Sequence, residues 1–301
     1  MIDLILTSVL VGLLYCLFTI GLSISFRVIN YPDLTLEGSA ILGGALCFNA
    51  LHFGLDPFTA LLVGFVGGAL AGVFTGILYL YANVSKLLSG IITTAILYSL
   101  NIRFLGGKSN VRLTDENTVF TLLNPSNASI PSILILSAFV ILILCILFFV
   151  FRLRVGYLLR ILGDNEKFIN TLGRNPNKFT LIGLGLSNGI IGLGGALMVQ
   201  YKNTCDINMS FGLLVGALAA LMLGESIFSA KSIFRHFTFS VVGTVLYSLV
   251  IGFVLFSWSS DWEKYVMASD VRLFTGLLLI ALAVFTKFKK TGKVSLFNSH
   301  W

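Results

Sequence analysis

Residues 152–178 read RLRVGYLLRILGDNEKFINTLGRNPNK and form a long polar island between two blocks of apolar segments. Charged residues make up 11% of the whole chain, yet this stretch alone holds six lysines and arginines. Phe168, Ile169 and Leu172 recur at helical spacing beside charged positions, and Gly173 stands where a helix end favours a left-handed residue. These features predict a short amphipathic helix at a membrane surface.

The composition places the rest of the chain in the bilayer. Hydrophobic residues make up 56% of the 301 residues, and the mean hydropathy is +0.95. Such a chain has too little polar surface to cover a soluble domain. Spanning helices need about 20 mostly apolar residues, whereas barrel strands alternate over about ten. The long apolar runs therefore predict an all-α, polytopic membrane helix bundle in a single domain, residues 1–301.

We predict about nine spans, with a range of about eight to ten because a reentrant or broken segment would change the number. Their approximate ranges are 4–26, 35–52, 57–82, 87–105, 131–151, 180–200, 211–230, 236–257 and 272–288. If residues 152–178 are cytoplasmic, that side carries 14 lysines and arginines against 6 outside, as the positive-inside rule requires. The N-terminus is then outside, and a basic tail, 288–301, is cytoplasmic.

Three carboxylates near predicted span ends need an explanation, because charge close to the bilayer is costly. Asp33 and Glu37 follow Pro32 at the mouth of the second span, where they could cap a helix, belong to a broken helix near the transport path, or form a surface for a cytoplasmic partner. Glu225 precedes a predicted cytoplasmic turn with Lys231 and Arg235, and could pair with either base. We keep a structural and a functional role open for all three.

Small residues recur every four positions in two predicted spans. The two series are Gly64, Gly68, Gly72 and Gly76, and Gly212, Gly216, Ala220 and Gly224. Such spacing lets helix backbones approach closely inside a membrane. We predict packing faces at both, with a pore-lining role as the alternative.

Hydroxyl and amide side chains mark two of the spans. Ser89, Thr93 and Thr94 form an interrupted polar stripe in the fourth, while Ser187 and Asn188 are the polar members of the sixth. These groups commonly bond to carbonyls within their own helix. A polar stripe deep in an apolar span nevertheless makes these five residues candidates for the substrate path.

The sequence offers no basis for catalysis. His52, His236 and His300 fall at span ends or in the tail, so neither a catalytic triad nor a metal site can be assembled from them. The run Gly106-Gly107-Lys108-Ser109 lacks the earlier glycine of a phosphate-binding loop, since Ile102 stands there. We therefore expect no enzyme activity, no metal, no nucleic acid and no cofactor bound by this chain.

Three segments resemble the permease subunits of the bacterial branched-chain amino acid and ribose class of ABC importers, nearest the branch with tryptophan-like or uncharacterised substrates. They are GLLYCLFTIGLSISFRVINYPDLTLEGSAILGGA (12–45), LLRILGDNEKFINTLGRNPNKFTLIGLGLSNGIIGLGGALMVQY (158–201) and GLLVGALAALMLGESIF (212–228). Asn175-Pro176 departs from the family pattern.

The resemblance implies a complex in the bacterial plasma membrane. Two permease copies, forming a homodimer, would pair with cytoplasmic ATPase subunits that bind ATP, and an extracytoplasmic binding protein would deliver an amino acid or similar small polar solute. The residues that would contact the ATPase form a coupling helix, namely Gly163, Asp164, Asn165, Glu166, Phe168, Leu172 and Gly173.

A secondary transporter driven by an ion gradient is the alternative function. It would need ionisable groups near the membrane midplane, whereas most carboxylates here lie near span ends. Aromatic amino acids, branched amino acids, nucleosides and sugars all remain open as substrates.

Overall fold

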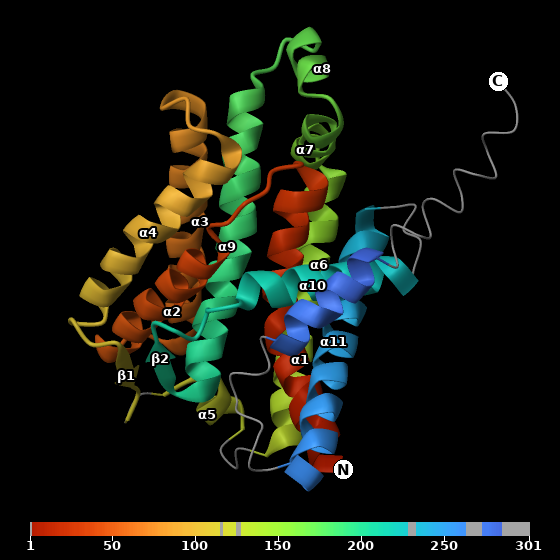
Figure 1. Cartoon of the computed structure of the whole chain (residues 1–301). Coiled ribbons are helices and arrows are strands. Elements are labelled where there is room, and N and C mark those ends of the chain that lie inside the picture. Colours follow the sequence, from red (N-terminus) through yellow and green to blue (C-terminus); the bar gives the residue numbers. More distant parts are fainter. Residues whose placement is uncertain (1, 115–116, 125–127, 228–232, 263–272, 285–301) are drawn as a thin grey trace, which may run out of the picture.

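The computed structural model describes residues 2–114, 117–124, 128–227, 233–262 and 273–284, and forms a bundle of helices (Figure 1). The helices are α1 (Ile2–Ser23), the π-helix η1 (Ile24–Val28), α2 (Leu36–His52), α3 (Pro57–Tyr81), α4 (Lys86–Phe104), α5 (Val119–Leu123), α6 (Ser129–Arg152), α7 (Arg154–Asp164), α8 (Glu166–Thr171), α9 (Pro176–Lys202), α10 (Leu213–Ile227), α11 (Ile233–Trp262) and a further helix, Leu273–Val284. The strands β1 (Asn110–Arg112) and β2 (Thr204–Asp206) pair antiparallel, with Val111 opposite Cys205.

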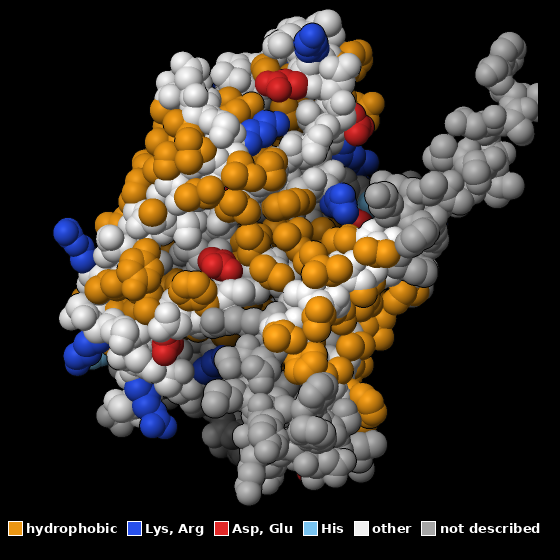
Figure 2. Space-filling model, in the orientation of Figure 1, with side chains coloured by type: hydrophobic (Ala, Val, Ile, Leu, Met, Phe, Trp, Pro, Cys, Tyr) orange, Lys and Arg blue, Asp and Glu red, His pale blue; other side chains and the backbone are white. Residues whose placement is uncertain are grey.

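The helical membrane bundle is confirmed, but nine full spans are not. Six helices of the described chain are long and apolar enough to cross a membrane: Asp3–Val28, Pro57–Tyr81, Lys86–Phe104, Ser129–Arg152, Pro176–Lys202 and Phe234–Val254. The other three predicted ranges coincide with shorter helices. α2 has 17 residues, α10 has 15, and Leu273–Val284 is shorter still. Hydrophobic side chains cover much of the face seen in Figure 2, as a bilayer requires.

Helix α9 lies at the centre of the bundle, where it packs against α3, α2 and α1 (Figure 1). The glycine series of α3 forms this contact, as predicted. A β-carbon at Gly68 would collide with the Asn188 carbonyl oxygen, and one at Gly72 with the Leu184 carbonyl oxygen. The glycines therefore allow two backbones to touch along the middle of the molecule.

The second small-residue series divides between two roles. Gly224 and Ala220 pack against Gly243 of α11, so a packing face is confirmed there. Gly212 instead precedes α10 with a φ of 84°, and Gly216 faces the Tyr247 ring of α11. The end of the series at Gly212 and Gly216 borders a cavity, described below.

The island at 152–178 folds into two short helices at one end of the bundle, whereas β1, β2 and α5 lie at the other end (Figure 1). The short helix predicted around Phe168, Ile169 and Leu172 is present as α8, and a second helix, α7, precedes it. α7 ends at Asp164, and Asn165 takes an extended conformation while its Oδ1 accepts from the Lys167 N–H at 3.1 Å, which caps α8. Gly173 has a φ of 67°, as predicted.

The departure at Asn175-Pro176 has a simple local explanation. Pro176 is the first residue of α9, where its missing N–H costs nothing, and Asn175 Oδ1 caps the helix by accepting from the Asn177 N–H at 2.9 Å. The dipeptide therefore marks a well-formed helix start. The predicted tail, 288–301, lies outside the described residues.

Candidate functional site

A buried polar network begins at Asp33, whose side chain is 1% exposed. Its Oδ2 accepts from Asn188 Nδ2 at 2.6 Å, and its Oδ1 accepts from the Thr35 N–H at 2.8 Å. Asn188 Oδ1 in turn accepts from Ser39 Oγ at 2.7 Å. Asp33 lies in the connection before α2, and its burial raises the pKa of the carboxyl, while the hydrogen bonds from Thr35 and Asn188 oppose that rise.

Pro32 and Asp33 do not begin a helix, contrary to the capping role that was one of their predicted roles. α2 starts at Leu36 with Thr35 as its N-cap residue, because Asp33 draws the Thr35 N–H into a turn instead. The broken-helix interpretation fits this geometry better, since an irregular, buried segment separates η1 from α2.

A chain of hydroxyl groups continues the network across α3 and α4. Thr35 Oγ1 and Thr75 Oγ1 lie 2.9 Å apart, and Thr75 donates to Thr93 Oγ1 at 3.0 Å. Tyr31 Oη and Ser89 Oγ lie 2.6 Å apart, and Thr94 donates to the Leu34 carbonyl at 3.0 Å.

The structure therefore brings four predicted path residues, Ser89, Thr93, Thr94 and Asn188, into one network. Ser187 points elsewhere, donating to the Gly21 carbonyl of α1 at 2.7 Å. All five make hydrogen bonds to other segments or within their helix, and none lines the cavity described next. Their assignment to the substrate path stays a prediction.

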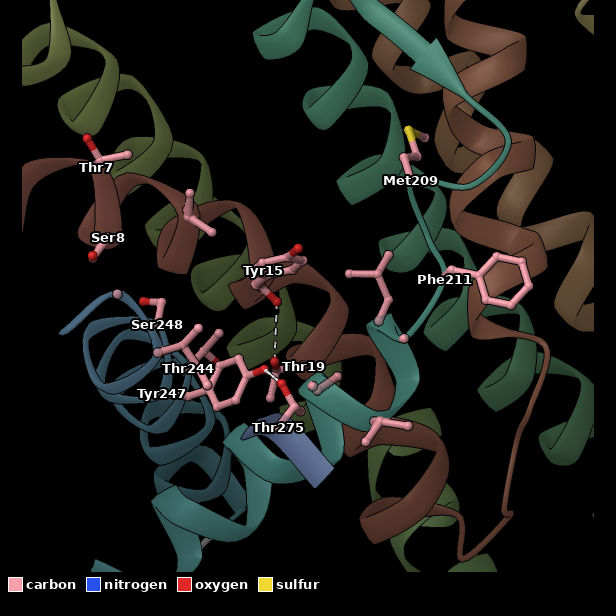
Figure 3. A pocket seen from close by; sticks show the side chains of 18 of the residues that line it. Thr7, Ser8, Tyr15, Thr19, Met209, Phe211, Thr244, Tyr247, Ser248 and Thr275 are labelled. Atoms are coloured by element: carbon pink, nitrogen blue, oxygen red, sulfur yellow. Dashed lines mark hydrogen bonds between the residues drawn. The ribbon is translucent and has the colours of Figure 1, made fainter. Parts of the chain in front are cut away.

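A cavity of about 840 Å³ opens on the other side of α1, among α1, α10, α11 and the Leu273–Val284 helix. Figure 3 shows Ser8, Tyr15, Thr244 and Tyr247 around it, with Met209 across the space. Sequence reasoning missed this cavity. The available signal was the spacing of polar side chains along the first span, because Ser8, Tyr15 and Thr19 share one helical face.

The two remaining predicted carboxylates lie at different places. Glu37 lines the cavity, and its Oε1 accepts from the Gly212 N–H at 2.9 Å. Glu225 pairs with Arg27 of η1, not with the predicted Arg235, through contacts of 2.7 Å from Nε and 2.6 Å from Nη2. Lys231, its other predicted partner, lies outside the described residues. Folding brings η1 against the end of α10, a proximity that sequence spacing cannot show.

The predicted coupling residues run from the end of α7 through α8 to Gly173, and all of them except Gly163 are exposed. Phe168 and Leu172 are 49% and 47% exposed, whereas Ile169 between them is fully buried. Asp164, Asn165 and Glu166 are exposed beside them. Gly163 packs directly against the backbone of η1, since a β-carbon there would collide with the Val28 carbonyl oxygen. One face of α8 is thus fixed in the core while an apolar pair faces outward. Among the described residues, no group of three potential metal ligands occurs.

The chain matches the family described as branched-chain amino acid transport system, permease component, over residues 4–292. It is 31% identical over 285 residues to a tyrosine transport system permease protein of Clostridioides difficile, covering 95% of this chain and 90% of that one. It is 27% identical to a probable branched-chain amino acid transport permease protein of Methanocaldococcus jannaschii, covering 80% and 84%. It is 22% identical to the ribose import permease protein of Escherichia coli, covering 86% and 77%.

These findings decide between the two transporter classes considered above. Members of the family are integral membrane components of ABC importers rather than enzymes, and the family implies a separate ATPase and a substrate-binding protein. The findings therefore favour the ABC importer over the secondary transporter. The chain belongs to this family, as a permease subunit of a binding-protein-dependent ABC importer.

Proposed function

We propose that this permease imports an amino acid, and that residues 163–173 couple it to its ATPase. The single observation that carries the coupling assignment is the arrangement of α8, where Ile169 is buried while Phe168 and Leu172 stay half exposed. The names of the two amino acid permeases among its relatives support the substrate class.

An apolar pair on a fixed helix suits a groove in a partner protein. A short helix of this kind inserts its exposed side chains into the groove and transmits a rigid-body movement. The buried Ile169 and the close contact of Gly163 with η1 would carry that movement into the bundle. The charges of Asp164 and Glu166 beside the pair would orient the partner.

We further propose that two copies of the chain form the complex, each binding one ATPase. The structure contains one copy, so this proposal rests on the resemblance to ABC importer permeases. Coexpression of two differently tagged copies tests it. Recovery of both tags in one purified complex supports the homodimer, and recovery of a different permease in place of the second copy overturns it.

Copurification tests the coupling assignment directly. The permease is expressed with its neighbouring genes and purified by a tag, with and without Phe168→Glu. We expect a stoichiometric ATPase with the wild type and its loss in the variant. Phe53→Glu is the matched control, because Phe53 is 82% exposed at the end of α2 and outside residues 163–173. An ATPase that stays bound to the Phe168→Glu variant would overturn the assignment.

A further inference from the structure

The side chains that line the cavity between α1 and α10 limit the classes of solute that it can bind. Its described lining residues include one carboxylate, that of Glu37, and no lysine, arginine or histidine. The remaining lining side chains combine hydroxyl groups and the amide of Asn208 with apolar and aromatic groups. A volume of about 840 Å³ is within the range of about 300–1,000 Å³ typical of small-molecule sites. We infer that this cavity is the substrate site of the permease and accepts a zwitterionic amino acid with a large apolar or aromatic side chain.

Glu37 supplies the group that would bind the ammonium of such a solute. Its Oε1 accepts from the Gly212 N–H, while its Oε2 has no hydrogen-bond partner among the described residues. The side chain is only partly buried, and it borders the open cavity. Among the described lining residues no basic side chain accompanies this carboxylate, so it is available to the ammonium of a solute.

The first turn of α10 supplies the complementary charge. Gly212, Leu213, Val215 and Gly216 line the cavity at the N-terminal end of this 15-residue helix. Free N–H groups and the helix dipole make that end positive. The hydrogen bond between Glu37 and Gly212 places the two opposite charges side by side. A zwitterion, whose ammonium and carboxylate are attached to one carbon, matches this pair better than a solute with a single charge.

The wall of the cavity that carries Tyr15 and Tyr247 suits the side chain of the amino acid. Tyr15 and Tyr247 face the space with Met209 opposite, as Figure 3 shows. Two hydroxyl groups on this wall, Tyr15 Oη and Ser8 Oγ, have no hydrogen-bond partner among the described residues, although Ser8 is only 8% exposed. Both residues line the cavity, so their hydroxyl groups are available to a polar group on the solute.

This inference deepens the proposed function and rests on it, so the test separates the two. The complete importer, with its ATPase and binding protein, is reconstituted in proteoliposomes, and ATP-driven uptake of L-tyrosine and L-phenylalanine is measured. Uptake by the wild type supports the amino acid function. Its absence would reject an aromatic amino acid as the solute, and the site assignment with it, without rejecting import of another amino acid.

Two substitutions then test the cavity itself. Val215→Trp fills it from α10, and Glu37→Gln removes the charge at nearly constant size. We expect uptake to fall about tenfold or more in each, as for the loss of a charge-assisted hydrogen bond or of the binding volume. Val242→Trp is the matched control for size, since Val242 is about as exposed as Val215, at 36% against 39%, and does not line the cavity.

Copurified ATPase and thermal midpoint are measured for every variant, so that misfolding is recognised. Glu37→Gln decides the outcome if the tryptophan variant fails to assemble. Wild-type uptake that persists in an assembled Glu37→Gln importer at an unchanged rate would overturn the site while leaving the amino acid function intact.

Discussion

Asn188 donates a hydrogen bond of 2.6 Å from its Nδ2 to Asp33 Oδ2, and so joins the centre of α9 to the connection before α2 across 155 sequence positions. The same amide accepts from Ser39 Oγ of α2. Inside a membrane, where apolar contact alone does not favour one helix pair over another, such polar contacts specify which segments meet. Four predictions follow from this network and from the packing around it.

Asn188→Ala should lower the free energy of unfolding by about 3 kcal/mol, because it leaves a buried carboxylate oxygen and the Ser39 hydroxyl without their partner. The thermal midpoint of the purified protein in detergent measures the change. Asn177→Ala, on the same helix, is the control, since its side chain makes no hydrogen bond among the described residues. Equal midpoints for the two variants would show that the network contributes nothing.

Asp33 should make stability depend on pH. Its burial raises the pKa above the ordinary aspartate value of about 4. The contribution of Asp33 to stability is therefore fully present below that ordinary value and is lost as pH rises through the folded-state pKa. We expect the midpoint of the wild type, relative to Asp33→Asn, to increase as pH falls from about 8 towards about 4. A difference between the two proteins that stays constant over this range would contradict the prediction.

The two neighbours on α8 should respond oppositely to truncation. Ile169→Ala should destabilise the protein by about 2–4 kcal/mol, because Ile169 is fully buried. Phe168→Ala should leave the midpoint almost unchanged, because Phe168 is 49% exposed, while lowering ATP-driven uptake. Midpoints and uptake measured on both variants separate folding from coupling. A large loss of stability in Phe168→Ala would place its side chain in the core instead.

Gly72→Ala should disrupt the contact between α3 and α9. Its β-carbon would meet the Leu184 carbonyl oxygen, which is backbone and cannot move aside as a side chain would. We expect a loss of about 1–3 kcal/mol, measured by the thermal midpoint or by the yield of folded protein. Gly276→Ala is the matched control, since a β-carbon at Gly276 meets nothing within 4 Å. Wild-type stability in Gly72→Ala would mean that the two helices can separate without cost.

The sequence by itself determined the class of the protein and the nature of its elements. Long apolar runs predict spanning helices because backbone groups in lipid must bond internally, and the glycine spacing on α3 predicts close packing for the same local reason. The polar island and its resemblance to importer permeases likewise predict a coupling region, and Gly173 takes the left-handed conformation expected of it. Each of these inferences depends on residues that are near one another in the chain.

Only the tertiary structure decided the partners of the polar residues and the location of the cavity. Asp33 and Asn188, or Arg27 and Glu225, are separated by more than a hundred positions, and no helical period relates them. The prediction for Glu225 considered nearby bases only and therefore did not include Arg27, with which it pairs. The cavity forms only where α1, α10 and α11 come together, and the face that each helix contributes does not by itself indicate a site. The helical periodicity and the composition of a sequence indicate which face one helix exposes. A site between helices depends on how several such faces pack together.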